Sequence, residues 1–150
     1  MRAVLQRVTS ASVTADGQPA GAIGRGLLIL LGVEVGDTRE ELAWLVRKVA
    51  GMRLFSDADG QMNLDLAAVD GRCLVVSQFT LLASSRKGNR PSYTRSARPE
   101  EAVPMYEAFV AALAEATGTA VETGVFGADM EVRLVNDGPV TVVVDTRLRE

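Results

Sequence analysis

Two short polar segments of this sequence have residue types that could bind and polarise a substrate. Ser77–Leu81 (Ser-Gln-Phe-Thr-Leu) follows an apolar stretch, and Asn136–Thr141 (Asn-Asp-Gly-Pro-Val-Thr) contains a Gly-Pro bond. The chain has no histidine, which excludes Ser-His-Asp and Cys-His catalysis and histidine-ligated zinc. Any catalysis must therefore depend on hydroxyls, amides, backbone groups, carboxylates or atoms of the substrate itself.

The first segment is predicted to close a strand that covers Arg72–Thr80. On a strand, Gln78 and Thr80 share one face and present an amide and a hydroxyl to a ligand. Backbone N–H groups lose their ladder partners where a strand breaks off, and two such groups can form an oxyanion hole. A plain strand end, whose hydroxyls cap the next turn, explains the same residues.

The second segment predicts a sharp reversal between two strands, Met130–Asn136 and Thr141–Asp145, because Asn, Asp, Gly and Pro favour turns. One interpretation is a simple hairpin turn. In the other, a cis bond between Gly138 and Pro139 holds two neighbouring carbonyls on the same side. Such carbonyls accept hydrogen bonds from an ammonium group and form a wall against a misplaced side chain.

A third feature is a cationic loop over Ser84–Arg98. It contains no acidic residue, and its basic residues are Arg86, Lys87, Arg90, Arg95 and Arg98. The whole chain has 16 basic and 19 acidic residues, so 16 − 5 = 11 basic residues stand against 19 acidic ones elsewhere. Its position after Ser77–Leu81 predicts a contact with phosphate, and a solvated surface loop is the alternative.

The composition favours one domain over residues 1–150, since 47% of the residues are hydrophobic and can form one core. Cys73, the only cysteine, is expected to be a small buried hydrophobe, and a lone cysteine favours a reducing, cytoplasmic location. The longest apolar stretch, Leu27–Val33, is too short to span a bilayer. Asp57–Gly60 lacks the ligand set of a calcium loop, so no metal is expected.

Hydrophobic periodicity predicts an α/β fold, a β-rich single domain in which helices cover one face of a mixed sheet and further strands form another layer. The first helix is capped at Asp37-Thr38, and the second begins at Pro99 and ends near Thr117-Gly118. Its buried stripe is predicted to be Val103, Tyr106, Val110, Leu113 and Ala114. The remaining predicted strands are Met1–Ala15, Gln18–Gly24, Leu27–Val33 (buried on both faces), Met52–Phe55 and Ala120–Thr123.

At these residues the chain resembles the D-aminoacyl-tRNA deacylase (D-tyrosyl-tRNA(Tyr) deacylase) family, over essentially its whole length. The segments that carry the resemblance are Ala3–Val8, Ser77–Leu81, Arg86–Ser92, Phe126–Met130 and Asn136–Thr141. The resemblance implies an α/β fold in three layers, a homodimer and no cofactor. It also implies hydrolysis of the ester bond of D-aminoacyl-tRNA, and of glycyl-tRNA mischarged on tRNA(Ala), with rejection of L-aminoacyl-tRNA.

The resemblance further implies roles for individual residues. The backbone N–H of Phe79 would donate to the reacting ester carbonyl, and Gly138-Pro139 would reach into the active site of the partner subunit. The implied catalytic residues are Ser77, Gln78, Phe79 and Thr80. The implied substrate-binding residues are Gly138, Pro139, Arg7, which would pin the Gly-Pro element, and Met130. The implied RNA-binding residues are Arg86, Lys87 and Arg90.

The favoured mechanism is attack by water on the ester, assisted by the 2′-hydroxyl of the terminal ribose. A nucleophilic Thr80 would need a base, and the chain offers neither a histidine nor a matched lysine. Two rival functions are kept open. One is a non-catalytic RNA-binding module that uses Arg86–Arg98, and the other is a small-molecule esterase or amidase with Thr80 as nucleophile.

Overall fold

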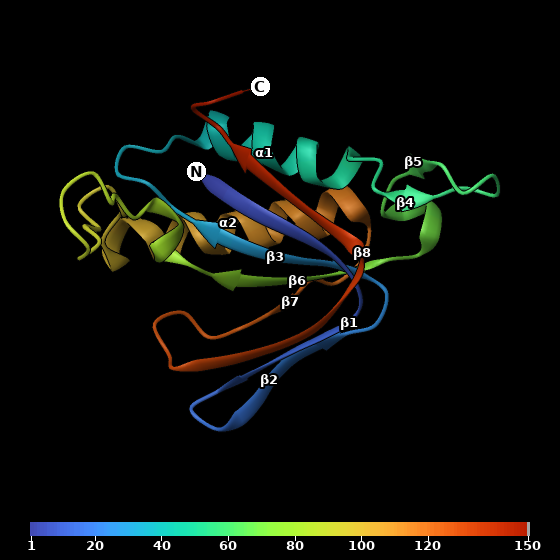
Figure 1. The fold of residues 1–150 in the computed structure, drawn as a ribbon, viewed down its shortest axis with the longest axis horizontal. Coiled ribbons are helices and arrows are strands. Elements are labelled where there is room, and N and C mark those ends of the chain that lie inside the picture. The colour runs from blue at the N-terminus through green and yellow to red at the C-terminus, as the bar shows by residue number, and fades with distance from the viewer. Residues whose placement is uncertain (150) are drawn as a thin grey trace.

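The computed structural model describes residues 1–149 (Figure 1). Its long strand β1 (Arg2–Ala15) pairs with three other strands of the sheet. Its first half pairs antiparallel with β3 (Gly26–Gly32) and its second half with β2 (Gln18–Ile23). β8 (Met130–Asp145) pairs antiparallel along its other edge. Parallel strands extend the sheet beyond β3, in the order β3, β6 (Arg72–Ser77) and β7 (Glu122–Thr123). The sheet is therefore mixed.

Each face of the sheet carries its own apolar core, as β3 illustrates. Leu27, Ile29 and Leu31 point to the core beneath the helices, whereas Leu28 points to the other core, which Val76 shares. This alternation follows from the period of two of a strand. The second core is closed by the second half of β1, by β2 and by the first half of β8. The predicted α/β fold, with helices on one face and a further strand layer on the other, is confirmed.

Both helices begin at the predicted residues, and the second also ends where predicted. α1 (Arg39–Gly51) starts at Thr38, whose hydroxyl accepts from the Glu41 N–H at 3.2 Å while the Glu41 carboxylate accepts from the Thr38 N–H at 2.8 Å. This reciprocal pair is a capping box. α2 (Pro99–Thr117) ends where Gly118 takes a left-handed φ of 68°.

The buried stripe of α2 differs from the predicted one. The buried residues are Ala102, Met105, Tyr106, Phe109 and Leu113. Val103, Val110 and Ala114 are only half-buried. The helix is turned so that Phe109, whose large side chain gains most from burial, is completely covered.

Asn136–Thr141 is not a hairpin turn, so the predicted reversal was wrong. β8 stays on β1, with Asn136 opposite Val8 before the Gly-Pro bond and Thr141 opposite Gln6 after it. Five steps along β8 therefore match two steps along β1, and the surplus residues form a bulge. Turn-forming residues also make bulges, and the sequence does not show that both flanking strands have the same neighbour.

β6 is shorter than predicted and ends at Ser77, after which a one-turn 3₁₀ helix, η2 (Phe79–Leu82), begins. The predicted strand at Met52–Phe55 is displaced to β4 (Phe55–Ser56). The other short elements are β5 (Met62–Leu64) and η1 (Ala67–Val69). Within the described residues, no helix is long and apolar enough to cross a membrane.

Cys73 lies in the middle of the parallel sheet. Its side chain is 1% exposed, and burial raises the pKa of the thiol to about 12. The thiol is therefore protonated and inert, which confirms the predicted role as a small buried hydrophobe.

Candidate functional site

The end of β6 leaves backbone donors free. The Gln78 N–H still donates to Leu31 O at 2.8 Å, but the chain then turns into η2. Among the described residues, the N–H groups of Phe79 and Thr80 have no acceptor, as expected at the start of a helical turn. Phe79 is 56% exposed and Thr80 is also exposed, so the turn that carries these donors lies at the surface. A pair of adjacent free N–H groups is the chemical requirement of an oxyanion hole.

A hollow of about 260 Å³ opens beside these donors. Several sequence-predicted residues meet there, since Ser77, Gln78 and Phe79 line it together with Met130 from β8. Gly127 and Ala128 complete its rim. They lie in the segment Phe126–Met130, but the residue pattern alone gave them no role because neither carries a functional group.

The Thr80 hydroxyl makes one hydrogen bond to a side chain among residues 1–149. The hydroxyl accepts a hydrogen bond from the Gln78 amide, although the two residues lie outside β6 and do not share a strand face as predicted. In the described part of the chain, no lysine or carboxylate bonds to this hydroxyl. The arrangement therefore gives Thr80 an amide partner but no base.

Tyr106 of α2 binds to the backbone of β6 next to the site. Its hydroxyl donates to Val75 O at 2.8 Å, and its ring meets the Phe126 ring edge-on, with centroids 5.9 Å apart. Burial raises the pKa of Tyr106 to about 12, so the phenol is a neutral donor. The sequence pattern had placed Tyr106 in the core, and it also lines a small hollow next to Ser77.

The bulge of β8 is held by side chains on both sides. Asn136 accepts from the Val140 N–H at 2.8 Å and donates to Val140 O at 3.1 Å, which closes the loop around the cis Gly138–Pro139 bond. Arg7 donates from Nε to Asp137 O at 2.9 Å and from Nη1 to Leu54 O at 2.6 Å. The guanidinium therefore fixes the residue directly before Gly138.

Gly138 cannot be replaced without rearrangement. Its φ is 142°, and a Cβ atom there would lie 2.8 Å from the backbone nitrogen of Val140 and 3.3 Å from Nη2 of Arg7. The left-handed φ and the close backbone both favour glycine at this position.

Within one chain the structure does not bring the bulge and η2 together. The bulge lies opposite Arg7 of β1. Arg7 pairs with Leu27 of β3, and Leu27 pairs with Cys73 of β6. Ser77 is therefore three strands across and four residues along, roughly 20 Å away at standard strand spacings. The two sets of sequence-predicted residues therefore lie apart on the same chain.

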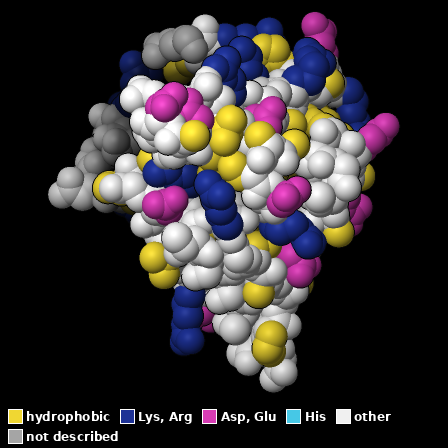
Figure 2. Space-filling model, turned by 90° about the vertical axis from the view of Figure 1, so that its right-hand side faces the viewer, with side chains coloured by type: hydrophobic (Ala, Val, Ile, Leu, Met, Phe, Trp, Pro, Cys, Tyr) yellow, Lys and Arg dark blue, Asp and Glu magenta, His cyan; other side chains and the backbone are white. Residues whose placement is uncertain are grey.

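The basic loop lies at the η2 end of the sheet (Figure 1). Ser84 and Ser92 close it through two backbone hydrogen bonds of 2.8 and 2.9 Å, which leaves Arg86, Lys87 and Arg90 exposed between them. Arg95 is not free, because its Nε donates to the buried carboxylate of Glu34 at 2.9 Å. On the face seen in Figure 2, by contrast, basic and acidic side chains are interspersed.

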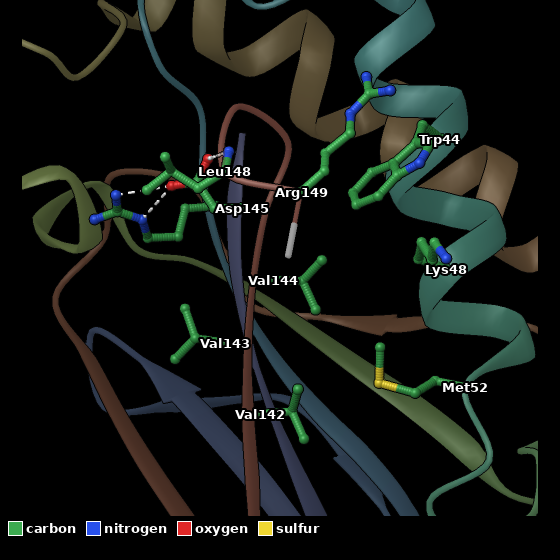
Figure 3. A pocket seen from close by; sticks show the side chains of 10 residues that line it. Trp44, Lys48, Met52, Val142, Val143, Val144, Asp145, Leu148 and Arg149 are labelled. Carbon is green, nitrogen blue, oxygen red and sulfur yellow. Dashed lines mark hydrogen bonds and ion pairs between the residues drawn. The ribbon is translucent and has the colours of Figure 1, made fainter.

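Another hollow, of about 610 Å³, lies between α1 and the end of β8 (Figure 3). The Trp44 ring is covered by Arg149 at 4.7 Å and Lys48 at 5.7 Å from its centroid. Among the described residues of its lining, the only carboxylate is that of Asp145, which is paired with Arg2 at 2.8 Å. These residues offer no nucleophile with a base, so the candidate site remains at η2.

Comparisons of sequence agree on one family. The model of a family described as D-Tyr-tRNA(Tyr) deacylase matches residues 4–145. Relatives named D-aminoacyl-tRNA deacylase align over 150 residues, which is 100% of both chains. The identity is 59% for the protein of Akkermansia muciniphila, 55% for that of Opitutus terrae and 53% for that of Flavobacterium johnsoniae.

Two solved structures share the fold. One, named c-Myc DNA Unwinding Element Binding Protein, has a TM-score of 0.89 at 40% identity, covering 97% of this chain and 98% of that chain. The other, described as a probable eukaryotic D-amino acid tRNA deacylase, has a TM-score of 0.85 at 17% identity, covering 95% and 97%. At that identity the second likeness supports the fold alone.

Replacing Tyr106 by Phe is expected to lower the free energy of unfolding by about 0.5–1.5 kcal/mol at pH 7, the usual net value of one hydrogen bond. The loss stays small because Val75 O keeps its bond from the Gly124 N–H. The pKa of the phenol is about 12 in the folded protein against an ordinary value of 10.0, so its contribution is present below pH 10 and is lost between pH 10 and 12.

Urea unfolding of the wild type and the Tyr106→Phe variant across that pH range measures this difference. Tyr93→Phe is the matched control, since the Tyr93 hydroxyl makes no hydrogen bond within residues 1–149. A difference between wild type and Tyr106→Phe that stays constant up to pH 12 would contradict the assignment.

Proposed function

The chain belongs to the D-Tyr-tRNA(Tyr) deacylase family, and we propose that it hydrolyses the ester bond of D-aminoacyl-tRNA, releasing the D-amino acid and free tRNA. As a member of this family it is a hydrolase that acts on carboxylic esters. The observation that carries the proposed site is the pair of free N–H groups at Phe79 and Thr80 beside the hollow. An oxyanion donor is typically worth about 2.7–4 kcal/mol of transition-state stabilisation.

The proposed mechanism places the ester carbonyl oxygen against the Phe79 N–H. Water attacks the carbonyl carbon, the bond to the ribose oxygen breaks, and that oxygen leaves with a proton. The ribose 2′-hydroxyl assists the transfer, because Thr80 has no base to activate its own hydroxyl. Gln78 orients the Thr80 hydroxyl, and Ser77 and Met130 shape the hollow that receives the aminoacyl group.

We propose that the protein distinguishes D from L substrates because Gly138-Pro139 sterically excludes an L side chain. The carbonyls of this element accept hydrogen bonds from the α-ammonium group and fill the space that an L side chain needs. A D side chain then points outward, so its identity matters little. Glycine has no side chain to reject, and we include glycyl-tRNA mischarged on tRNA(Ala) among the substrates. The cellular role is proofreading in translation, in the cytoplasm.

This mechanism requires a second copy of the chain. Gly138 and Ser77 lie roughly 20 Å apart in one chain, as estimated from strand spacing, so one copy cannot supply both to one ester. We propose a homodimer in which Gly138-Pro139 of each subunit enters the site of the other. Exposed apolar side chains on β8 support a partner on this side, with Val135 56% and Val143 63% exposed.

The exposed cations of the basic loop are proposed to contact tRNA phosphates. Arg86, Lys87 and Arg90 project from a closed loop at the η2 end of the molecule and form no ion pair with any of the described residues. Phosphate contacts position a nucleic acid without reading its sequence, which suits an enzyme that acts on many tRNAs.

The first test compares hydrolysis of D-tyrosyl-tRNA and L-tyrosyl-tRNA by the purified protein, with glycyl-tRNA(Ala) as a third substrate. We expect rapid loss of the D ester, measurable loss of the glycyl ester and background loss of the L ester. Equal loss of D and L esters would refute exclusion by Gly138-Pro139. Binding of tRNA without cleavage would favour the RNA-binding module, and cleavage of free D-amino-acid esters at the same rate would favour the small-molecule esterase.

Replacing Gly138 by Ala is expected to slow D-tyrosyl-tRNA hydrolysis by about tenfold to a hundredfold, since a misplacement of 1 Å can cost that much. The new Cβ atom would meet the Val140 backbone at 2.8 Å. Gly17→Ala is the matched control, because Gly17 also has a left-handed φ, of 78°, but has no atom within 4 Å of the new Cβ. Equal effects of the two substitutions on the rate would argue against a role for Gly138.

Replacing Arg86, Lys87 and Arg90 together by Ala is expected to raise KM and leave kcat unchanged. Each lost phosphate contact lowers the slope of log K against log salt by about 0.7–0.9, so the triple variant should lose about 2. Measuring KM at several salt concentrations tests this. A triple replacement of the exposed Arg39, Arg47 and Arg53 controls for net charge, and an equal loss of slope in that control would contradict a local contact.

A further inference from the structure

η2 packs through two of its side chains: Leu82 is 0% exposed, and the Phe79 ring meets the Tyr93 ring edge-on with centroids 5.1 Å apart. It is a single turn of four residues, Phe79 and Thr80 are exposed, and only the Leu82 side chain is buried. Two of its backbone carbonyls also accept hydrogen bonds from side chains of other elements. A short, exposed turn of this kind opens easily unless its backbone groups are held by other elements.

The two side chains that donate to carbonyls of η2 come from different parts of the chain. The Ser96 hydroxyl donates to Phe79 O at 3.0 Å, from the loop that precedes α2. Nη1 of Arg2 donates to Leu81 O at 2.7 Å, from the first residue of β1. The two anchors differ in rigidity, because Ser96 belongs to the loop, whereas Arg2 belongs to the central strand of the sheet.

The Arg2 guanidinium is itself fixed by Asp145. Nε and Nη2 both lie 2.8 Å from Oδ2 of Asp145, whose side chain is 8% exposed (Figure 3). Oδ1 accepts from the Arg147 N–H at 2.8 Å and the Leu148 N–H at 3.3 Å. Burial acts to raise the pKa of Asp145, but these hydrogen bonds and the charge of Arg2 lower it overall, so the carboxylate stays ionised.

We propose that Arg2 is a positioning residue for ester hydrolysis, which holds η2 and its free N–H groups in place through Leu81 O. The effect of Arg2 on catalysis rests on the proposed function, whereas the anchoring of η2 by Arg2 does not depend on it. Arginine suits the role because its planar fork presents Nε and Nη2 to the carboxylate and Nη1 to the carbonyl in a fixed geometry, whereas the three donors of a lysine ammonium share one nitrogen. Charge-assisted bonds are also stronger than neutral ones, so the anchor from Arg2 outweighs that from Ser96.

The test uses Arg2→Met and the double variant Arg2→Met/Asp145→Asn. The single variant leaves the Asp145 carboxylate without its cation and therefore loses stability as well as the anchor. In the double variant an uncharged Asn still accepts from the Arg147 N–H, so the unpaired charge is gone while Leu81 O remains without its donor. Arg53→Met is the matched control, because Arg53 likewise donates to a carbonyl, Asn63 O at 2.7 Å, far from η2.

Two readouts are taken on each full-length variant: amide hydrogen exchange at Leu81 and Ala83, whose N–H groups bond to Gln78 O and Thr80 O, and single-turnover hydrolysis of D-tyrosyl-tRNA. We expect the double variant to recover thermal stability, to exchange faster than wild type only around η2, and to react about tenfold to a hundredfold more slowly with little change in binding. Arg53→Met should match the wild type in both.

Wild-type exchange around η2 in the double variant would overturn the proposal, as would a wild-type rate, or a slower rate without faster exchange. If the wild type itself hydrolyses no ester, the proposed function fails, and hydrogen exchange still decides whether Arg2 anchors η2.

Discussion

The antiparallel ladder between β1 and β8 is the constraint on which both functional surfaces depend. It runs from Arg2 opposite Asp145 to Ala15 opposite Met130, and its register shifts at the bulge around Gly138 and again between Val8 and Ser10 of β1. Two arginines project from β1 along this ladder, and each donates to a backbone carbonyl of a surface segment. Arg2 holds η2 through Leu81 O, and Arg7 holds the bulge through Asp137 O. A single strand therefore sets the positions of both segments.

The groups available for chemistry at the end of β6 belong to the backbone. Where β6 ends, the chain offers N–H donors and no acid or base, and the Thr80 hydroxyl is bonded to an amide. A site of this kind contributes by orientation and by fixed dipoles, which need no reorganisation during the reaction. It suits an ester that is already activated, since the leaving ribose oxygen has a neighbouring hydroxyl. The demand on the protein is then rigidity, which the arginine anchors supply.

The sequence predicted much of this fold because local signals and burial agreed. Thr38 and Gly118 bounded the helices, and the apolar run of β3 matched a strand buried on both faces. The error at Gly138 arose because a bulge and a hairpin use the same residues, and only the pairing partner on β1 separates them. The end of β6 was misplaced for a related reason. Gln78 continues the ladder by one bond, and no local signal marks the 3₁₀ turn that follows.

The separation of the two surfaces follows from the geometry of the ladder rather than from any one residue. A bulge on β8 faces the middle of β1, whereas a parallel strand such as β6 presents its free N–H groups only at its end. The two therefore lie apart on any single copy of this sheet. The homodimer that we propose resolves this, since a two-fold, isologous contact would pair each bulge with the other copy's strand end. Under this proposal, selectivity by exclusion is a property of the assembly, with Arg7 holding the excluding element in one copy and Arg2 holding the reacting backbone in the other.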